Sequence, residues 1–537
     1  MNADPHLDAV TIEILWSRLV SIVDEAAKVI ARTAFSTLSN EANDFACVLT
    51  DAQGRSLAQN TYGIPSFIAT LPATVCHTIE AFPLDTMRPG DIYLTNDPWK
   101  GTGHLPDICL IRPVFMGERI VAFSATTSHV PDIGGNVRSA APREIFEEGL
   151  HIPLMLFMRD GVADPLLLRL IGINVRTPAQ TLGDVWAQVS ANEMMAQRLA
   201  AMMAEYALPN LAGLGHEIFA RSEAAMRRAI AALPEGTTRY VMETDGLEAP
   251  FRFEVALTVA DGGIVADFTG TSPQQKRAVN CPLTYTNAMT FYALKCALLP
   301  DLPNNDGMFR PIRVVAPERC LLNPLFPAAV GARAVSGHYV PVLVFGALHQ
   351  VLPGRVMAAP GSPLWSLTIT GEHGVMKERF TSVLFFNGGL GARPDRDGAP
   401  CLSWPSNISS TPVEIAERNA PLLFAHKRLS PGSGGEGRFR GGLGQEVLLT
   451  VEAAGGASAF FMVERTRFGA PGLEGGGTGV PGGVRINGVD VDARVPQHLE
   501  AGDTIAVTTP GGGGYGEAAR RDPALAGRDR VMGYLVP

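Results

Sequence analysis

Two short apolar runs lie close together in the chain, and a tight turn joins them. The runs cover residues 108–115 and 120–125, each has the length of a β-strand, and Gly117 marks the bend between them. This pattern predicts an antiparallel hairpin. A hairpin constrains the fold because residues just before its first strand must lie beside residues just after its second strand.

A repeated motif flanks the predicted hairpin. The sequence His-Leu-Pro-Asp runs from His104 to Asp107, and His-Val-Pro-Asp runs from His129 to Asp132. If the ends of the hairpin meet, His104, Asp107 and His129 can converge. Two imidazoles and one carboxylate with room for a water are typical of an open catalytic metal site. The alternative, that each histidine is a hydrogen-bonded structural residue, stays open at this point, and other histidines such as His338 are interpreted in that way.

The order of the predicted elements indicates an α+β chain with several domains and mixed sheets. A chain of 537 residues is too long for one hydrophobic core. We predict an N-terminal α/β domain over residues 1–235 that carries the metal site, and a middle α/β domain over residues 236–357. Glycine clusters and β-type runs predict a β-rich C-terminal domain over residues 358–537.

Within this outline, helical spacing of apolar residues predicts the main helices. The predicted helices cover residues 10–33, part of 65–82, 185–206, 216–233 and 338–351. The charged segment 143–150 is interpreted as a surface segment or lid.

The net charge bears on which molecules the protein can bind, and the cysteines bear on the cellular compartment in which it works. The formal charge of −9 gives no electrostatic reason to bind nucleic acid or anionic lipid. No apolar run is long enough to span a membrane, and the first residues lack a basic-then-apolar signal pattern. Seven scattered cysteines without a Cys-x-x-Cys pair favour a reduced, cytoplasmic setting.

The glycine-rich tracts near the C-terminus are interpreted as tight loops of a β-rich domain. The tract 433–444 resembles a nucleotide-binding loop only superficially, because it lacks the Gly-x-x-x-x-Gly-Lys-Ser/Thr pattern. The tracts 475–483 and 509–516 are similar in composition. The sequence therefore predicts no ATP site in this chain.

Several motifs are spread over nearly the whole chain. They are Asn-Asp-Pro at 96–98, the His-Leu-Pro-Asp motif at 104–107, Asn-Val-Arg at 174–176, Asp-Phe-Thr-Gly-Thr-Ser at 267–272, the glycine tracts at 433–444 and 510–516, and Arg-Asp-Pro at 521–523. In kind and in order, these motifs resemble those of the hydantoinase B/oxoprolinase family, which includes the B subunit of ATP-dependent N-methylhydantoinases and the α-subunits of acetone-type carboxylases.

This resemblance implies a divalent metal, either Zn, Mn or Fe, and a set of ligands for it. The ligands would be His104, Asp107 and His129, with Asp44 as the fourth and Glu41 as the second choice for that position. Asp132 or Glu41 would act as the base or orient a ligand. The resemblance also implies a separate A-type subunit that binds ATP, and therefore a hetero-oligomer of the two subunits.

One segment departs from the family pattern. Many members have Pro-Val-His-Leu-Gly where this chain has Pro-Ser-Phe-Ile-Ala at residues 65–69, so Phe67 stands in the place of a histidine. This difference puts in doubt any role of a histidine there, and it affects the shape of the pocket.

The leading hypothesis from these features is a subunit that opens a cyclic amide such as a hydantoin, 5-oxoproline or lactam-like ring. The partner subunit would activate the carbonyl with ATP, and a metal-activated water would attack it. One alternative is the α-type subunit of an acetone- or acetophenone-type carboxylase. The other is a non-catalytic scaffold for the ATP-binding subunit.

Overall fold

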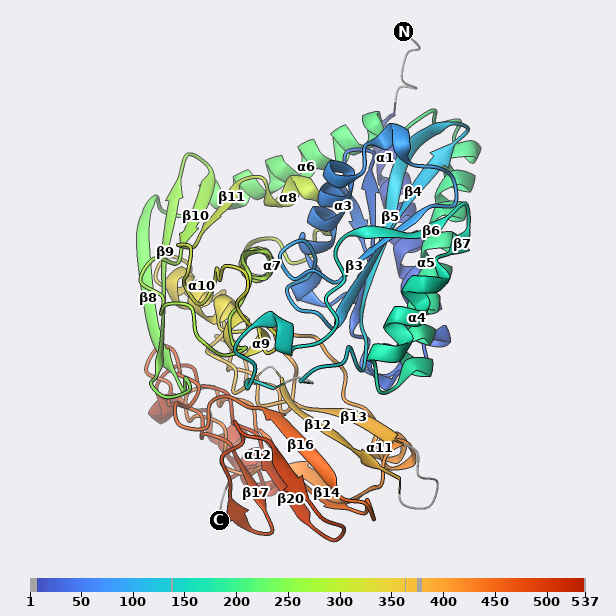
Figure 1. Cartoon of the computed structure of the whole chain (residues 1–537). Helices are drawn as coiled ribbons and strands as arrows, with labels where there is room; N and C mark the ends of the chain where they lie inside the picture. The colour runs from blue at the N-terminus through green and yellow to red at the C-terminus, as the bar shows by residue number, and fades with distance from the viewer. Residues whose placement is uncertain (1–6, 137–138, 363, 374–378, 536–537) are drawn as a thin grey trace.

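The chain folds into three regions that follow its sequence order (Figure 1). The N-terminal region, in blue and teal, is a large sheet flanked by helices, and the middle region adds a second sheet. The C-terminal region, in orange and red, is mainly β-structure. The computed structural model describes residues 7–136, 139–362, 364–373 and 379–535. The predicted α+β, multidomain architecture is confirmed.

The N-terminal region is organised around a seven-stranded sheet. Its strands are β1 (Phe45–Asp51), β2 (Ser56–Gln59), β3 (Ile92–Thr95), β4 (Asp107–Met116), β5 (Arg119–His129), β6 (Met155–Arg159) and β7 (Val162–Ala163). Their spatial order is β2-β1-β5-β4-β3-β6-β7. The β4–β5 hairpin predicted from the sequence therefore lies at the centre of the sheet.

Helices cover both faces of this sheet. They are α1 (Ala9–Thr33), α2 (Thr37–Asn40), α3 (Thr70–Ala81), α4 (Pro165–Asn174), α5 (Pro178–Glu205) and α6 (Ala212–Ala231), with short 3₁₀ turns η1 (Pro65–Phe67), η2 (Leu84–Thr86) and η3 (Ile145–Glu147). Cys47 and Leu49 of β1 pack in the core cluster of α1 and α5, whereas Val48 packs in the cluster of α3. Strands buried on both faces need apolar residues at successive positions, which explains the unbroken apolar runs.

The strand β5 is longer than the run that predicted it. The apolar run ends near Ala125, but the strand continues to His129. The hydroxyl of Thr126 donates to Gln188 Oε1 at 3.1 Å and accepts from Asn192 Nδ2 at 2.7 Å, so α5 satisfies a buried polar residue of the strand. Polar strand residues with partners on a helix are invisible to a search for apolar runs.

The middle region packs a four-stranded sheet against two buried helices. Its elements are β8 (Gly236–Thr244), β9 (Phe251–Ala260), β10 (Gly263–Asp267), α7 (Leu283–Leu298), α8 (Asp306–Phe309), β11 (Ile312–Val315), α9 (Ala334–Gly337) and α10 (Val340–His349). The sheet order is β11-β10-β9-β8. The helix predicted over residues 338–351 is present as α10, with α9 as a separate turn before it.

The C-terminal region contains two further sheets, ordered β13-β12-β16-β19 and β14-β15-β20-β17-β18. Its elements are β12 (Trp365–Glu372), β13 (Arg379–Phe386), α11 (Val413–Asn419), β14 (Leu422–Leu429), β15 (Gln445–Val451), β16 (Ala457–Met462), β17 (Gly483–Ile486), β18 (Val489–Asp490), β19 (Gln497–Leu499), β20 (Thr504–Thr508), η4 (Ala518–Arg520) and α12 (Pro523–Val531). Each of the four sheets falls within one predicted domain, and the boundaries at 235/236 and 357/358 stay predictions.

The glycine tracts pack against one another, backbone to backbone. Gly435 donates to the carbonyl of Gly512, Gly512 donates to Gly442, and Gly514 donates to Gly477, each at 2.8–3.0 Å. A Cβ atom built on Gly441 would lie 1.9 Å from the carbonyl oxygen of Gly512. The glycines are therefore needed for close packing of the three tracts, which accounts for the tract at 433–444 without a nucleotide.

Among the helices that the structure describes, none combines the length and the apolar character that a membrane span requires.

Candidate metal centre

The central hairpin brings three of the predicted ligands together. Asp107 begins β4 and His129 ends β5, and the two residues are direct partners in the antiparallel register. His104 lies in the turn before β4, with its Nε2 atom 2.8 Å from Asp107 Oδ1 and 3.1 Å from His129 Nδ1. His129 Nδ1 is 2.9 Å from the same carboxylate oxygen. All three side chains are buried, and their ligand atoms lie within 4.8 Å of one another.

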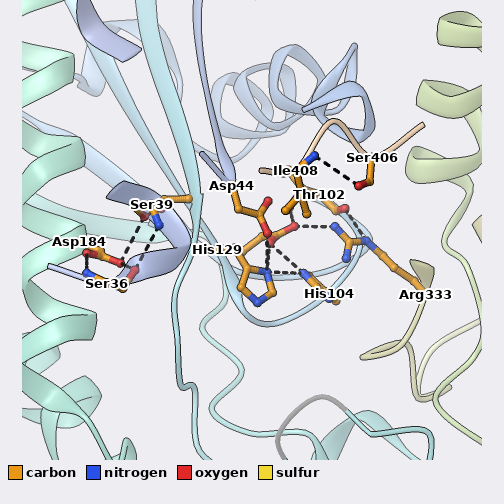
Figure 2. Close-up of polar contacts among 12 residues, drawn as sticks. Ser36, Ser39, Asp44, Thr102, His104, His129, Asp184, Arg333, Ser406 and Ile408 are labelled. Atoms are coloured by element: carbon orange, nitrogen blue, oxygen red, sulfur yellow. Dashed lines mark hydrogen bonds and ion pairs between the residues drawn. The ribbon is translucent and has the colours of Figure 1, made fainter. Parts of the chain in front are cut away.

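Asp44 reaches this cluster from the neighbouring strand (Figure 2). β1 begins at Phe45, which opposes Ser128 near the end of β5. The backbone N–H of His129 donates to the Asp44 carbonyl at 3.0 Å, and Asp44 Oδ2 lies 3.9 Å from His129 Nδ1. The four predicted ligands thus come from three separate segments and meet in one buried place.

A second network, made of hydrogen bonds to Asp184, holds residues 35–39 in place just before Asp44. The Asp184 carboxylate on α5 accepts from the backbone N–H groups of Phe35 and Ser36 at 2.8 and 3.0 Å, and from the Ser36 hydroxyl. The Ser39 hydroxyl also donates to Asp184 at 3.3 Å, as Figure 2 shows. This anchors α2 against α5 and so limits where Asp44 can lie.

The orientation of the Asp107 carboxylate is set by two donors. Its Oδ2 atom accepts from the Thr102 hydroxyl at 2.7 Å and from Arg333 Nη2 at 2.6 Å. These bonds leave Oδ1 turned toward the two imidazoles. Burial alone would raise the pKa of Asp107, but the charge of the adjacent Arg333 guanidinium helps to hold this pKa well below its usual range, so the group is a carboxylate at neutral pH.

The tautomer of His104 follows from its other ring nitrogen. Nδ1 lies 3.1 Å from the carbonyl oxygen of Gly331, which can only accept, so Nδ1 carries the proton and Nε2 carries a lone pair. Burial, together with Arg333, lowers the pKa of His104 to about 4. The ring is therefore neutral near pH 7, and its lone pair points at Asp107 Oδ1.

These residues fit a divalent cation. The His104 lone pair and the Asp107 carboxylate are both acceptors, yet they lie 2.8 Å apart, and a cation between them removes this conflict. Ligand atoms at about 2.1 Å from an ion lie about 3 to 3.4 Å from one another, close to the separations of 2.8–3.1 Å found here. Mixed imidazole and carboxylate ligands suit Zn, Mn or Fe. A carbonyl that fixes the tautomer of a ligating histidine is also usual at such sites.

The two residues predicted as the base lie outside this cavity. Asp132 Oδ1 is 2.7 Å from Arg176 Nη1, and its carboxylate also accepts from the backbone N–H groups of Gly134 and Arg176. Glu41 follows α2 and is half-buried. Neither side chain lines the cavity formed by the four ligands. The assignment of either as the base stays a prediction, with no contact that supports it.

Four residues from other regions complete the site. The sequence did not point to three of them, and the fourth, His338, was interpreted as a structural histidine. Arg333 and Gly331 come from the loop before α9, and His338 follows α9. Tyr285, on α7, lies under the Arg333 guanidinium at 4.5 Å. All four line a cavity of about 30 Å³ with the ligands. Burial lowers the pKa of His338 to about 3, so this ring is also neutral.

The departure from the family pattern at residues 65–69 lies at this same cavity. Ser66 and Ile64 line it, whereas Phe67 is buried in a cluster with Leu364 and Phe385 of the C-terminal region. The residue in the place of a histidine therefore packs in the core, and Ser66 is the polar group that this segment contributes.

The sequence matches one family model over residues 8–518, described as hydantoinase B/oxoprolinase. A relative from Pseudomonas sp. (strain NS671), named as the B component of a D-/L-hydantoinase, is 28% identical over 559 residues, covering 99% of this chain and 93% of that protein. A 5-oxoprolinase of Dictyostelium discoideum is 28% identical over 527 residues. That match covers 95% of this chain but 40% of the relative, so the chain spans about two fifths of the 5-oxoprolinase.

Two solved structures share the fold. The ATP-dependent caprolactamase of Pseudomonas jessenii superposes with a TM-score of 0.91 and 24% identity, covering 99% of this chain and 95% of that one. A nucleotide-free acetone carboxylase superposes with a TM-score of 0.86 and 20% identity, covering 98% and 78%. The family model spans nearly the whole chain, as the order of the motifs predicted. The chain therefore belongs to the hydantoinase B/oxoprolinase family.

Proposed function

We propose that this chain is the metal-binding subunit of an ATP-dependent enzyme that opens a cyclic amide ring. Family membership supports this class of reaction, as do the names of the relatives, which include a hydantoinase component, 5-oxoprolinases and a caprolactamase. The observation that carries the proposal is the contact between His104 Nε2 and Asp107 Oδ1, two acceptors held face to face beside His129.

The residues of this chain hold and orient the proposed ion. Asp44, His104, Asp107 and His129 would be its ligands, and Arg333 keeps one oxygen of Asp107 turned toward it. When bound, such an ion supplies Lewis-acid activation of water near neutral pH. The burial of the cluster excludes bulk water, which strengthens the electrostatic interactions inside it.

The energy to activate the amide would come from a partner. The chain lacks the Gly-x-x-x-x-Gly-Lys-Ser/Thr pattern, and its glycine tracts pack against one another. The 5-oxoprolinase relatives are more than twice as long as the segment that they share with this chain. We therefore infer that ATP is bound by a separate A-type subunit, which phosphorylates the carbonyl oxygen of the ring and forms a hetero-oligomer with this chain.

The test combines elemental analysis with ring-opening assays of the complex with its A-type subunit. We expect about one Zn, Mn or Fe per chain, and ATP-dependent opening of a hydantoin, 5-oxoproline or a lactam. The His104→Ala/His129→Ala double variant should lose both the metal and ring opening. A double variant that keeps full activity would falsify the proposal.

A carboxylase is the second candidate, because the acetone carboxylase shares this fold. Incorporation of isotopically labelled bicarbonate into the product would support it and would count against hydrolysis. The scaffold alternative makes a different prediction. Under it, metal-free protein would support partner turnover as well as metal-loaded protein does.

A further inference from the structure

The loop of residues 330–333 contacts two of the proposed metal ligands. The carbonyl oxygen of Gly331 accepts from His104 Nδ1 at 3.1 Å, and Arg333 Nη2 donates to Asp107 Oδ2 at 2.6 Å. Each contact uses the atom that faces away from the other ligands, because Nε2 of His104 and Oδ1 of Asp107 face each other. The position of this loop therefore decides how both ligands are oriented.

Glu148 holds this loop in place. Its Oε1 atom accepts hydrogen bonds from the backbone N–H groups of Val330 at 2.7 Å and Gly331 at 2.6 Å. Gly331 is thus bonded on both sides, since its N–H group donates to Glu148 and its C=O group accepts from His104. A displacement of the Glu148 carboxyl would be transmitted through this one residue to the carbonyl that sets the tautomer of His104.

The segment that carries Glu148 is fixed on two sides. The backbone N–H of Ile145 donates to the carbonyl of Pro327 at 3.0 Å, just before the loop. The backbone N–H of Leu150 donates to the carbonyl of Ile133 at 2.8 Å, in the segment that follows β5. These bonds place the Glu148 carboxyl between the loop and the end of the central hairpin.

The carboxyl group of Glu148 is costly to bury. The residue is 5% exposed, and its Oε2 atom has no hydrogen-bond partner among the residues that the structure describes. Burial raises the pKa of the group to about 8, so near pH 7 it is mainly the neutral acid. Together with His129 it lines a cavity of about 10 Å³. A buried acid with one unsatisfied oxygen lowers stability, and such costs are typical of functional sites.

We propose that Glu148 is a positioning residue of the metal centre, which holds the Gly331 carbonyl against His104 so that Nε2 of the imidazole is presented to the ion. The presence of the ion rests on the proposed function, whereas the role of Glu148 rests on hydrogen bonds within this chain. Glu148 acts on the affinity for metal and does not touch the reacting atoms. Groups that orient a metal ligand without touching the metal typically contribute about 10- to 100-fold to metal affinity.

The experiment measures the Zn affinity of the full chain by competition with a chelating dye, without ATP and without a partner subunit. Glu148→Ala removes the acceptor of the Val330 and Gly331 N–H groups, so it should bind Zn about tenfold more weakly than the wild type. Glu148→Gln keeps an acceptor oxygen and has the charge of the neutral acid, so it should restore the affinity. Equal affinity of the wild type and Glu148→Ala would overturn the proposal, and so would an equal loss in both variants.

Two controls separate positioning from general destabilisation. Glu147→Ala makes the same change at the neighbouring residue, which is exposed, and should bind Zn as the wild type does. Gly441→Ala disturbs the packing of the glycine tracts and does not line the metal cavity, so it should lower the melting temperature without changing the Zn affinity. If Gly441→Ala weakened Zn binding as much as Glu148→Ala does, the effect would be one of stability alone and the proposal would fail.

A second measurement observes the orientation of His104 itself. In NMR spectra of the full chain with isotopically labelled histidine, with and without Zn, the Nδ1–H proton of His104 is identified by its loss in His104→Ala. In the wild type and in Glu148→Gln this proton should give a sharp signal, because it donates to the Gly331 carbonyl in a buried place. In Glu148→Ala the signal should be broadened by exchange with water. An equally sharp signal in Glu148→Ala would refute the role of Glu148.

The outcomes are separable from those of the proposed function. If the wild type binds no metal, the proposed function fails, whereas the His104 signal of the metal-free protein still shows whether Glu148 positions the imidazole. If the wild type binds metal and opens cyclic amides but Glu148→Ala matches it in both measurements, the positioning role is wrong and the proposed function stands.

Discussion

The Nε2 atom of His104 lies 2.8 Å from Oδ1 of Asp107, and both atoms are acceptors. The Gly331 carbonyl fixes the ring proton on the far nitrogen, so the imidazole cannot turn this contact into an ordinary hydrogen bond. A short acceptor–acceptor contact in a buried place is unfavourable, and a cation between the two atoms would relieve it. Metal binding should therefore stabilise this fold.

Thermal unfolding tests this directly. A ligand at 100 times its dissociation constant stabilises a fold by about 2.7 kcal/mol, so saturating Zn or Mn should raise the melting temperature of the chelator-treated protein by several degrees. The His104→Ala/His129→Ala variant should show no such rise. The control is His216→Ala, an exposed residue of α6, which should respond as the wild type does. Equal metal responses in all three proteins would contradict the prediction.

Arg333 should stabilise the fold through Asp107. Arg333→Met leaves the Oδ2 atom of a buried carboxylate with the Thr102 hydroxyl as its remaining donor and removes the charge partner, so the free energy of unfolding of metal-free protein should fall by about 3–5 kcal/mol. A bound cation would offset part of this loss, so the effect should be smaller with metal. Urea unfolding with and without Zn measures both values.

The control for Arg333 is an exposed ion pair. Arg485 and Asp490 form a contact of 2.9 Å with side chains that are 62% and 82% exposed. Arg485→Met should change the free energy of unfolding by less than about 1 kcal/mol. Similar losses in the two variants would mean that burial does not decide the contribution of Arg333.

The pH dependence of stability should depend on Glu148. Burial raises the pKa of this carboxyl from 4.5 to about 8, although the N–H groups of Gly331 and Val330 oppose the shift. Between these values the unfolded chain releases a proton that the folded chain keeps. Stability should therefore fall as the pH rises from about 4.5 to 8, by at most about 1.4 kcal/mol per pH unit.

Glu148→Gln isolates this contribution. Glutamine keeps an oxygen for both N–H groups but does not titrate in this range. The variant should gain stability over the wild type as the pH rises, and the two should converge below about pH 4.5. Urea unfolding at pH 5, 6, 7 and 8 measures the difference, and a constant offset across that series would rule out the assignment.

The parts of the site that follow from local pattern could be predicted. The hairpin was expected from two apolar runs and Gly117, and its antiparallel register puts Asp107 opposite His129. His104 must then lie close to both residues, because it comes only three positions before Asp107 in the sequence. The sequence signal is strong here because the two strands of a hairpin follow each other in the sequence and also pair in space. Residues at their ends are therefore neighbours in the fold.

The rest of the site depends on long-range packing. Arg333 and Gly331 lie more than 200 residues from His104, and no periodicity or motif connects them. Glu148 falls in the segment interpreted as surface or lid, yet it is buried because its carboxylate caps the backbone of Val330 and Gly331. Only the tertiary fold brings these segments to one side of the hairpin, so sequence reasoning about single segments could not find them.

The glycine tracts lead to the last prediction, which concerns stability alone. A methyl group on Gly441 would lie 1.9 Å from the carbonyl oxygen of Gly512, so the two loops would have to separate and their hydrogen bonds would be strained. Gly441→Ala should lower the free energy of unfolding by about 3 kcal/mol or more. Gly483→Ala is the matched control, because nothing lies within 4 Å of its added methyl group. This change should be neutral or stabilise by up to about 1 kcal/mol through the unfolded chain. Equal melting temperatures for the two variants would mean that the tracts are flexible loops and not a packed core.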